Sequence, residues 1–136
     1  MKILTTKLVY QLAFIASVSI LAACEKPTPQ QIQAKLHLPK EKVTRNIGLG
    51  KSIYRNSCSS CHGIGTKGTL KGPPLVYRTY RPSHHSDMAF HLAVKNGVKQ
   101  HHWNFGHMPP VENLTPEQVE HLIGYVRDEQ RRAGIQ

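Results

Sequence analysis

Two cysteines and a histidine lie close together near the middle of the chain, in the sequence Cys58-Ser59-Ser60-Cys61-His62. Two thiols at this spacing can form thioether bonds to the two vinyl groups on neighbouring edges of one porphyrin. The histidine that follows directly is placed under the iron, where a ring nitrogen can serve as an axial ligand. The motif therefore predicts one covalently bound haem c, attached through Cys58 and Cys61.

A Cys-x-x-Cys pair on its own also occurs in zinc sites, thiol redox pairs and disulfides. A structural zinc site needs four ligands, which usually include a second pair at similar spacing. The sequence has no second Cys-x-x-Cys pair, although its nine histidines leave a mixed zinc site open. A thioredoxin-like pair is expected beside a strand–helix–strand pattern, and the flanking residues do not show one. Haem attachment is the favoured interpretation.

A methionine in a loop bounded by glycine and proline is the candidate second axial ligand, in the sequence Gly106-His107-Met108-Pro109-Pro110. Its sulfur is a soft ligand that favours reduced iron, and the prolines stiffen the chain. A methionine can also simply fill a core, and His107, another histidine or Met88 could bind the iron instead. The choice matters because six-coordinate haem transfers electrons, whereas five-coordinate haem binds gases or peroxide.

The amino terminus resembles a bacterial export signal that ends in a lipoprotein box. Basic residues come first, an apolar stretch follows over residues 8–23, and the stretch ends in Leu21-Ala22-Ala23-Cys24. In such a box the cysteine carries a lipid and cleavage occurs just before it. A transmembrane anchor is the alternative, but the stretch is shorter than the about 20 residues that a span needs. We predict a signal peptide over residues 1–23 and lipid attachment at Cys24.

This leader predicts a location in a bacterial cell envelope, lipid-anchored and facing the periplasm. Glu25, in place of an aspartate after the lipid cysteine, hints at the outer membrane, but outer versus inner membrane stays open. Residues 24–43 contain several prolines and glutamines and predict a flexible tether, with at most a short helical turn over residues 32–38. Residues 44–136 are expected to form the folded domain.

The hydrophobic pattern of that domain predicts an all-α fold without a convincing strand. The expected helices cover residues 45–57, 86–96 and 115–133. Thr115, Pro116 and Gln118 match a capped helix start. Gly50, inside the first helix, costs about 1 kcal/mol relative to alanine, so we expect another backbone to approach it closely.

Taken together, these motifs resemble class I cytochrome c. In chain order they are Gly50 with Tyr54, CSSCH at 58–62, GPPL at 72–75, GHMPP at 106–110 and LIGYV at 122–126, within residues 45–133. The resemblance implies a class I cytochrome c fold, with helices packed around one covalently bound haem c. It also implies a monohaem electron-transfer protein that cycles between Fe(II) and Fe(III).

The resemblance further assigns roles to individual residues. It implies thioethers at Cys58 and Cys61 and axial ligation by His62 and Met108. The carbonyl of Pro73 would accept the second ring N–H of His62 and orient the imidazole. The side chains expected to line the pocket or to reach a haem propionate are Trp103, Arg78 and Arg81.

The resemblance also implies that Gly50 and Tyr54 cross the last helix near Leu122 and Tyr125. One departure from the family pattern concerns the distal side of the haem. The threonine or serine that contacts the methionine in some members is not identifiable in this sequence.

The charge is strongly positive, with 18 basic and 8 acidic side chains and a formal net charge of +10. Lysines flank the segments expected around the exposed haem edge, namely Lys67, Lys71, Lys95 and Lys99. They predict docking to a redox partner with an acidic surface, and a solvated basic face is the alternative. Nucleic acid is not an expected partner, because an exported lipoprotein without a binding motif has no means to recognise it.

Two histidine pairs, His84-His85 and His101-His102, have no role in this scheme. They could form a copper or zinc site beside the haem, or a pH-sensitive patch. The sequence alone favours solvated loop histidines.

We therefore expect an electron carrier rather than an enzyme, because no substrate bond changes. Two alternatives stay open. One is a haem subunit that acts within a larger oxidoreductase complex, and the other is a ligand-binding or peroxidatic haem protein with a labile methionine. The sequence does not name the electron donor, the acceptor or the pathway.

Overall fold

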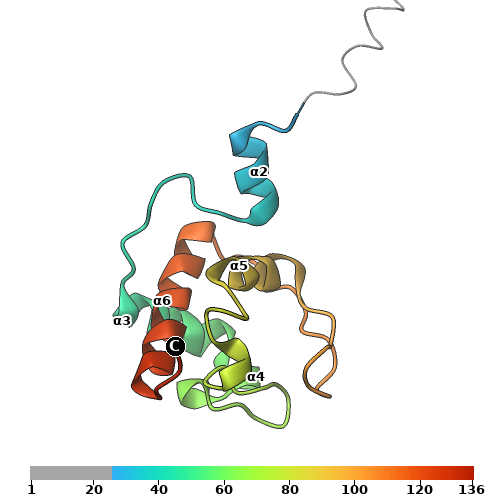
Figure 1. Ribbon diagram of the computed structural model, residues 1–136, viewed down its shortest axis with the longest axis vertical. Helices are drawn as coiled ribbons and strands as arrows, with labels where there is room; N and C mark the ends of the chain where they lie inside the picture. The colour runs from blue at the N-terminus through green and yellow to red at the C-terminus, as the bar shows by residue number, and fades with distance from the viewer. Residues whose placement is uncertain (1–25) are drawn as a thin grey trace, which may run out of the picture.

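Residues 26–136 fold as a set of short helices without a sheet (Figure 1). The computed structural model describes residues 26–136, so the predicted signal peptide and Cys24 lie outside the described residues. The α-helices are α2 (Pro29–Leu36), α3 (Ile47–Ser57), α4 (Ser59–His62), α5 (Asp87–Asn96) and α6 (Pro116–Arg132), and the 3₁₀ helices are η2 (Ile64–Thr66) and η3 (Arg78–Tyr80). Within residues 26–136, β-pairing is limited to isolated bridges, which agrees with the all-α prediction.

The core lies where α3 crosses α6. A β-carbon on Gly50 would overlap the carbonyl oxygen of His121 and would lie 3.0 Å from the β-carbon of Tyr125. One turn further along α3, the buried ring of Tyr54 packs at 5.3 Å from the ring of Tyr125. The expected crossing is therefore present, and it explains the glycine in α3. The buried apolar side chains around it are Ile53, Val94, Val119, Leu122, Ile123 and Val126.

The helix boundaries follow from their caps. The side chain of Thr115 accepts a hydrogen bond from the backbone of Gln118, whose side chain binds back to Thr115, so α6 begins with the predicted capping box. Helix α3 begins at residue 47 rather than 45, because the Asn46 side chain accepts the backbone N–H of Leu49 at 3.0 Å. Sequence analysis missed this asparagine cap.

An additional helix, α2, lies within the segment predicted as a flexible tether. Thr28 and Gln31 form a reciprocal capping box around Pro29, at 2.7 and 3.2 Å. The expected turn over residues 32–38 was therefore placed too late, because this cap was overlooked. The helix lies at one end of the molecule, beside α5 (Figure 1). None of the helices within the described residues is long and apolar enough to cross a membrane.

Two long side-chain contacts hold α2 on the domain. The ammonium group of Lys95 donates to the carbonyl oxygens of Ala34 and Lys35, at 2.5 and 3.0 Å. Nε2 of His37 lies 3.1 Å from the carbonyl oxygen of Leu114. Lys95 therefore caps the carboxyl end of α2 and is less available for docking a partner than the sequence suggested.

Arg127 of α6 organises a buried polar network, with 5% of its surface exposed. Its guanidinium donates to Asp87 Oδ1 at 2.8 Å, to the Gln130 side chain at 2.7 Å, and to the carbonyl oxygens of Tyr80 and His85 at 2.8 and 2.5 Å. The planar fork of an arginine can satisfy four acceptors in this way. The network fixes the segment before α5 against the last helix.

Candidate functional site

A cavity of about 420 Å³ lies between the motif segments and the helical core. Cys58, His62 and Met108 all line it, although Met108 comes from a distant loop. Most of the remaining wall is apolar and includes Leu75, Phe90, Leu92, Val98, Leu122 and Val126. A largely apolar cavity of this size is typical of a small-molecule or cofactor site.

Most of the Cys-x-x-Cys-His segment forms the short helix α4, and Cys58 is the single residue that separates it from α3. The backbone N–H of His62 donates to the carbonyl oxygen of Cys58 at 2.9 Å, which closes the turn. Gly63 then reverses the chain at φ 78°, and the buried hydroxyl of Tyr54 donates to its carbonyl oxygen at 2.7 Å. Both cysteines and the histidine are thus presented from one rigid turn that is anchored on the core.

His62 has one ring nitrogen committed to the protein. Nδ1 lies 2.9 Å from the carbonyl oxygen of Pro73, and a carbonyl can only accept, so Nδ1 carries the proton. Nε2 is then the unprotonated nitrogen, with a free lone pair. Burial lowers the pKa of His62, and the bond to Pro73 opposes this change. The hydrogen bond expected from the sequence is therefore present, and it leaves Nε2 available as a ligand.

The surroundings of the two cysteines do not favour a thiol redox pair or a zinc site. Burial, and secondarily the neighbouring Cys61, raises the pKa of the Cys58 thiol to about 11. A thiol with so high a pKa is mostly protonated at neutral pH, which does not suit a redox nucleophile. A zinc ion would deprotonate its own thiol ligands, so a zinc site has to be judged from the ligands that surround the two cysteines. Among residues 26–136, the grouped side chains that could hold a metal ion do not include either cysteine.

Met108 is held in the cavity wall by the end of α5. Its backbone forms a two-way bridge with Val98, at 2.9 and 3.0 Å. Gly97 has φ 70°, and a β-carbon there would overlap the carbonyl oxygen of Met108. Backbone pairing therefore supports the loop in addition to the two prolines. The rivals His107 and Met88 do not line the cavity, and Nδ1 of His107 accepts the backbone N–H of Gln100 at 3.0 Å.

Trp103 lines the cavity, and its indole nitrogen is buried without a hydrogen-bond partner within the described structure. Burial raises the pKa of the neighbouring Tyr80. A buried donor usually has an acceptor, and a haem propionate would supply one, so these residues fit the group that the motif implies. Arg78 and Arg81 are exposed outside the cavity wall, and Arg81 instead donates to Ser83 and to the Arg78 carbonyl.

The two histidine pairs meet in the fold, which is the arrangement that a metal site would need, whereas the sequence alone favours separate solvated loop histidines. His85, His101 and His102 line the cavity, and His84 lies beside them. The occurrence of the histidines as adjacent pairs was the one indication of this cluster in the sequence. The two pairs lie before and after α5 in the chain, and only the fold brings them together.

Comparison with known proteins identifies the family. The profile of the family described as cytochrome c matches residues 47–129, which is more than half of the chain. The chain is 35% identical over 95 residues to cytochrome c-L of Methylorubrum extorquens, covering 68% of this chain and 43% of that protein. It therefore spans less than half of that relative's length. A crystal structure of cytochrome CL from the marine methylotrophic bacterium Methylophaga aminisulfidivorans matches with 27% identity and a TM-score of 0.42, over 62% of this chain and 60% of that chain.

An all-α fold around a Cys-x-x-Cys-His turn defines the class of protein as a c-type haem protein. The chain belongs to the cytochrome c family and is a class I c-type cytochrome. Its cofactor is covalently attached haem c, and Cys58 and Cys61 fit the attachment motif.

Proposed function

We propose that the protein is a monohaem electron carrier in which His62 and Met108 are the two axial ligands of the haem iron. The observation that carries the proposal is that both side chains line one cavity together with Cys58. Bound haem c supplies the one-electron Fe(II)/Fe(III) chemistry. The protein contributes the ligands, excludes water and positions the cofactor, and no substrate bond changes, so we propose a carrier rather than an enzyme.

The two ligand-bearing segments are rigid for independent reasons. The Pro73 carbonyl oxygen orients the imidazole of His62 at 2.9 Å, and the bridge to Val98 holds the backbone of Met108. Ligands that the protein holds in place before the iron changes its oxidation state keep the same positions in the Fe(II) and Fe(III) forms. Such a site favours electron transfer over the binding of an external ligand. Ordered backbone on both sides of the cavity thus supports the carrier over a peroxidatic protein with a labile methionine.

The surface near the attachment turn is suited to a protein partner. Ile64 and Leu70 are 87% and 98% exposed, and Lys67 and Lys71 lie in the same loop. Neither lysine forms an ion pair within the described residues. Exposed apolar side chains flanked by free positive charges favour a redox protein with an acidic rim, whose association weakens with salt.

Carbon monoxide tests the proposal, because it binds reduced haem that has an open or weakly held axial position. We expect the absorption spectrum of the reduced protein to stay unchanged under carbon monoxide, while the Met108→Ala variant binds it rapidly. Rapid binding by the wild-type protein would contradict the carrier and favour a ligand-binding haem protein.

We also propose that Cys24 carries a lipid that anchors the protein in the cell envelope, with the haem domain facing the periplasm. The support is the sequence Leu21-Ala22-Ala23-Cys24 after an apolar stretch. Cell fractionation tests the anchor: the wild-type protein should sediment with membranes, and Cys24→Ser should release the haem-loaded protein or leave its leader uncleaved. A Cys24→Ser protein that is processed and stays on membranes as the wild type does would contradict lipid attachment.

A further inference from the structure

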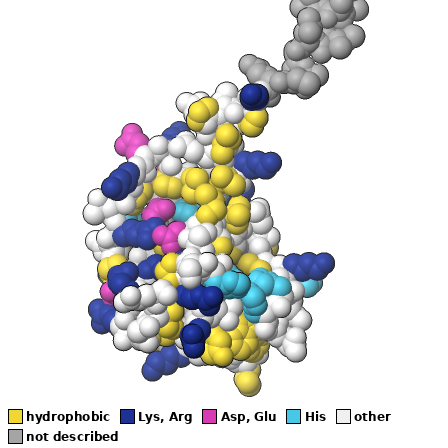
Figure 2. Space-filling model, viewed as in Figure 1, with side chains coloured by type: hydrophobic (Ala, Val, Ile, Leu, Met, Phe, Trp, Pro, Cys, Tyr) yellow, Lys and Arg dark blue, Asp and Glu magenta, His cyan; other side chains and the backbone are white. Residues whose placement is uncertain are grey.

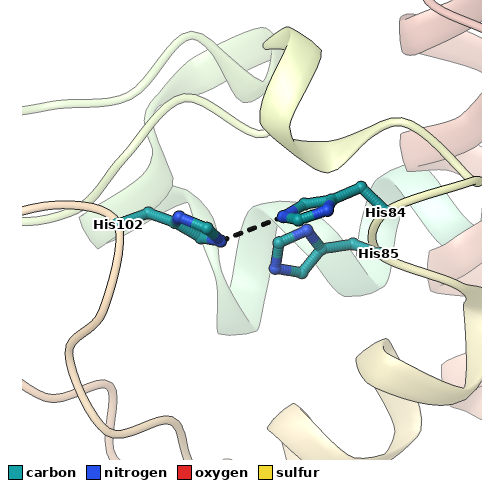
Figure 3. A group of neighbouring side chains, drawn as sticks. All are labelled: His84, His85 and His102. Atoms are coloured by element: carbon teal, nitrogen blue, oxygen red, sulfur yellow. Dashed lines mark hydrogen bonds between the residues drawn. The ribbon is translucent and has the colours of Figure 1, made fainter.

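Three histidines from two separate loops meet beside the haem cavity. His84 and His85 precede α5, and His102 belongs to the loop that follows it. Each can offer one ring nitrogen, and these nitrogens all lie within 4.8 Å of one another. The close-up shows the three rings gathered between the loops, with His84 and His102 facing each other (Figure 3). Histidine side chains also gather visibly on this part of the surface (Figure 2).

We propose that His84, His85 and His102 form a binding site for a divalent transition-metal ion, with Zn²⁺ as the best fit. Nε2 of His84 lies 3.3 Å from Nε2 of His102. Two imidazole nitrogens on one tetrahedral zinc, each about 2.0–2.1 Å from the ion, are separated by about 3.3–3.4 Å. These two nitrogens therefore already have the spacing of a zinc ligand pair, and the nitrogen that His85 offers lies within 4.8 Å of both.

His85 is prepared for this role by its surroundings. Its Nδ1 lies 2.8 Å from the carbonyl oxygen of Thr79, so Nδ1 carries the proton and Nε2 keeps its lone pair. Metal-binding histidines nearly always donate their second ring N–H to a carbonyl or carboxylate in this way. The backbone carbonyl oxygen of His85 also accepts a hydrogen bond from the buried guanidinium of Arg127. The loop that presents His85 is thus fixed from both sides.

The donor set selects the class of ion. Three imidazoles with no carboxylate in the group favour zinc, copper or nickel over calcium or magnesium, which prefer oxygen ligands. His101 lies close by, with its ring 4.3 Å from that of His102, and its Nδ1 faces the Lys99 carbonyl oxygen at 2.8 Å. The fourth position is therefore open to water or to His101.

Binding at this site connects two segments that border the haem cavity. His85 and His102 line that cavity, and the loop of His102 continues to Met108. A bound ion ties this loop to the segment before α5, which α6 already holds through Arg127. We therefore expect Zn²⁺ to stabilise the folded protein, because it binds the native arrangement and not the unfolded chain. The site rests in this respect on the proposed ligation by Met108, because His85 and His102 also line the haem cavity and must be free of the iron to bind Zn²⁺.

Calorimetric titration of the haem-loaded protein with Zn²⁺ alone tests the proposal, using protein without a polyhistidine tag. We expect one equivalent to bind to the wild type. The double variant His84→Gln/His102→Gln changes two exposed side chains and should weaken Zn²⁺ binding at least about tenfold. Removing even a residue that only hydrogen-bonds to a metal ligand lowers metal affinity about 10- to 100-fold. His121→Gln, which removes a histidine of α6 outside the cluster, should bind as the wild type does. An unchanged haem spectrum shows that each variant is folded.

Thermal unfolding gives a second measurement. Zn²⁺ should raise the unfolding temperature of the wild type and of His121→Gln, and it should leave that of His84→Gln/His102→Gln unchanged. The absence of stoichiometric binding to the wild type would overturn the site. Equal binding and equal stabilisation in the double variant would also overturn it, because the ion would then bind elsewhere.

Discussion

The carbonyl oxygen of Pro73 lies 2.9 Å from Nδ1 of His62. The two residues belong to motifs that are interlocked at further points. The Thr69 hydroxyl donates to the carbonyl oxygen of Cys61 at 2.6 Å, and a β-carbon on Gly72 would lie 2.9 Å from that oxygen. The loop after the attachment turn therefore folds back on it and sets both the tautomer and the orientation of the imidazole.

Gly50→Ala should strongly destabilise the protein, because its new methyl group would overlap the His121 carbonyl where α3 crosses α6. We expect a loss of about 2–4 kcal/mol in the free energy of unfolding, since backbone against backbone cannot relax easily. Urea denaturation of the haem-loaded protein measures this.

Gly48→Ala is the matched control in the same helix. A β-carbon at position 48 would meet only the Asn46 side chain, at the ordinary contact distance of 3.4 Å. Alanine favours helix over glycine by up to about 1 kcal/mol, so this change should be neutral or stabilising. Similar losses for both variants would show that the close crossing is not the reason for Gly50.

Arg127→Lys should cost about 2–4 kcal/mol of stability, although it keeps the charge. A lysine cannot reproduce the planar fork that binds Asp87, Gln130 and two backbone carbonyls, so buried acceptors lose their partners.

The control for Arg127→Lys is Arg132→Lys, whose side chain is 73% exposed and pairs only with Asp128 among the described residues. We expect a change of at most about 0.5 kcal/mol there, since exposed ion pairs contribute little. Chemical denaturation compares the two, and equal effects would contradict a structural role for the buried network.

Stability should fall in acid, in part through Asp87. Burial alone would raise the pKa of this carboxyl, but hydrogen bonds from Arg45 and Arg127 hold the pKa below its ordinary value. A carboxylate whose pKa is lower in the folded state stabilises the protein above its unfolded pKa of about 3.9. That contribution is lost as the pH falls through the lower, folded pKa.

The Asp87→Asn variant should therefore be less stable than wild type at pH 6 and should lose less stability between pH 6 and pH 3. Urea denaturation at both pH values tests this. Glu112→Gln removes an exposed carboxylate without an ion pair in the described structure and serves as the control. An acid response of Asp87→Asn equal to that of the wild type would show that the ion pairs with Arg45 and Arg127 do not control it.

The sequence predicts those parts of the site that depend on local spacing. The attachment turn, the Pro73 carbonyl and the crossing at Gly50 follow from motifs whose residues are near neighbours or belong to a known family pattern. The start of α6 follows from a capping box that is complete within four residues. The start of α2 has the same kind of box, with Thr28 and Gln31, and could have been predicted.

Features that depend on the relative position of distant segments could not be predicted. The ring contact between His84 and His102 spans α5, and its distance depends on how two irregular loops fold. The same holds for Lys95, whose ammonium group binds carbonyls about sixty residues earlier in the chain. Nothing in the pattern around Arg127 marks it as buried, because three of its four partners, the Asp87 side chain and two backbone carbonyls, belong to remote segments.

We propose that Met108 binds the haem iron opposite His62. Near-infrared absorption of the oxidised protein tests it most directly, because sulfur ligation to ferric haem gives a charge-transfer band in that region. We predict the band in the wild type, in His107→Ala and in His84→Gln/His102→Gln, and its loss in Met108→Ala. A wild-type protein without the band, or a Met108→Ala protein that keeps it, would contradict this ligation.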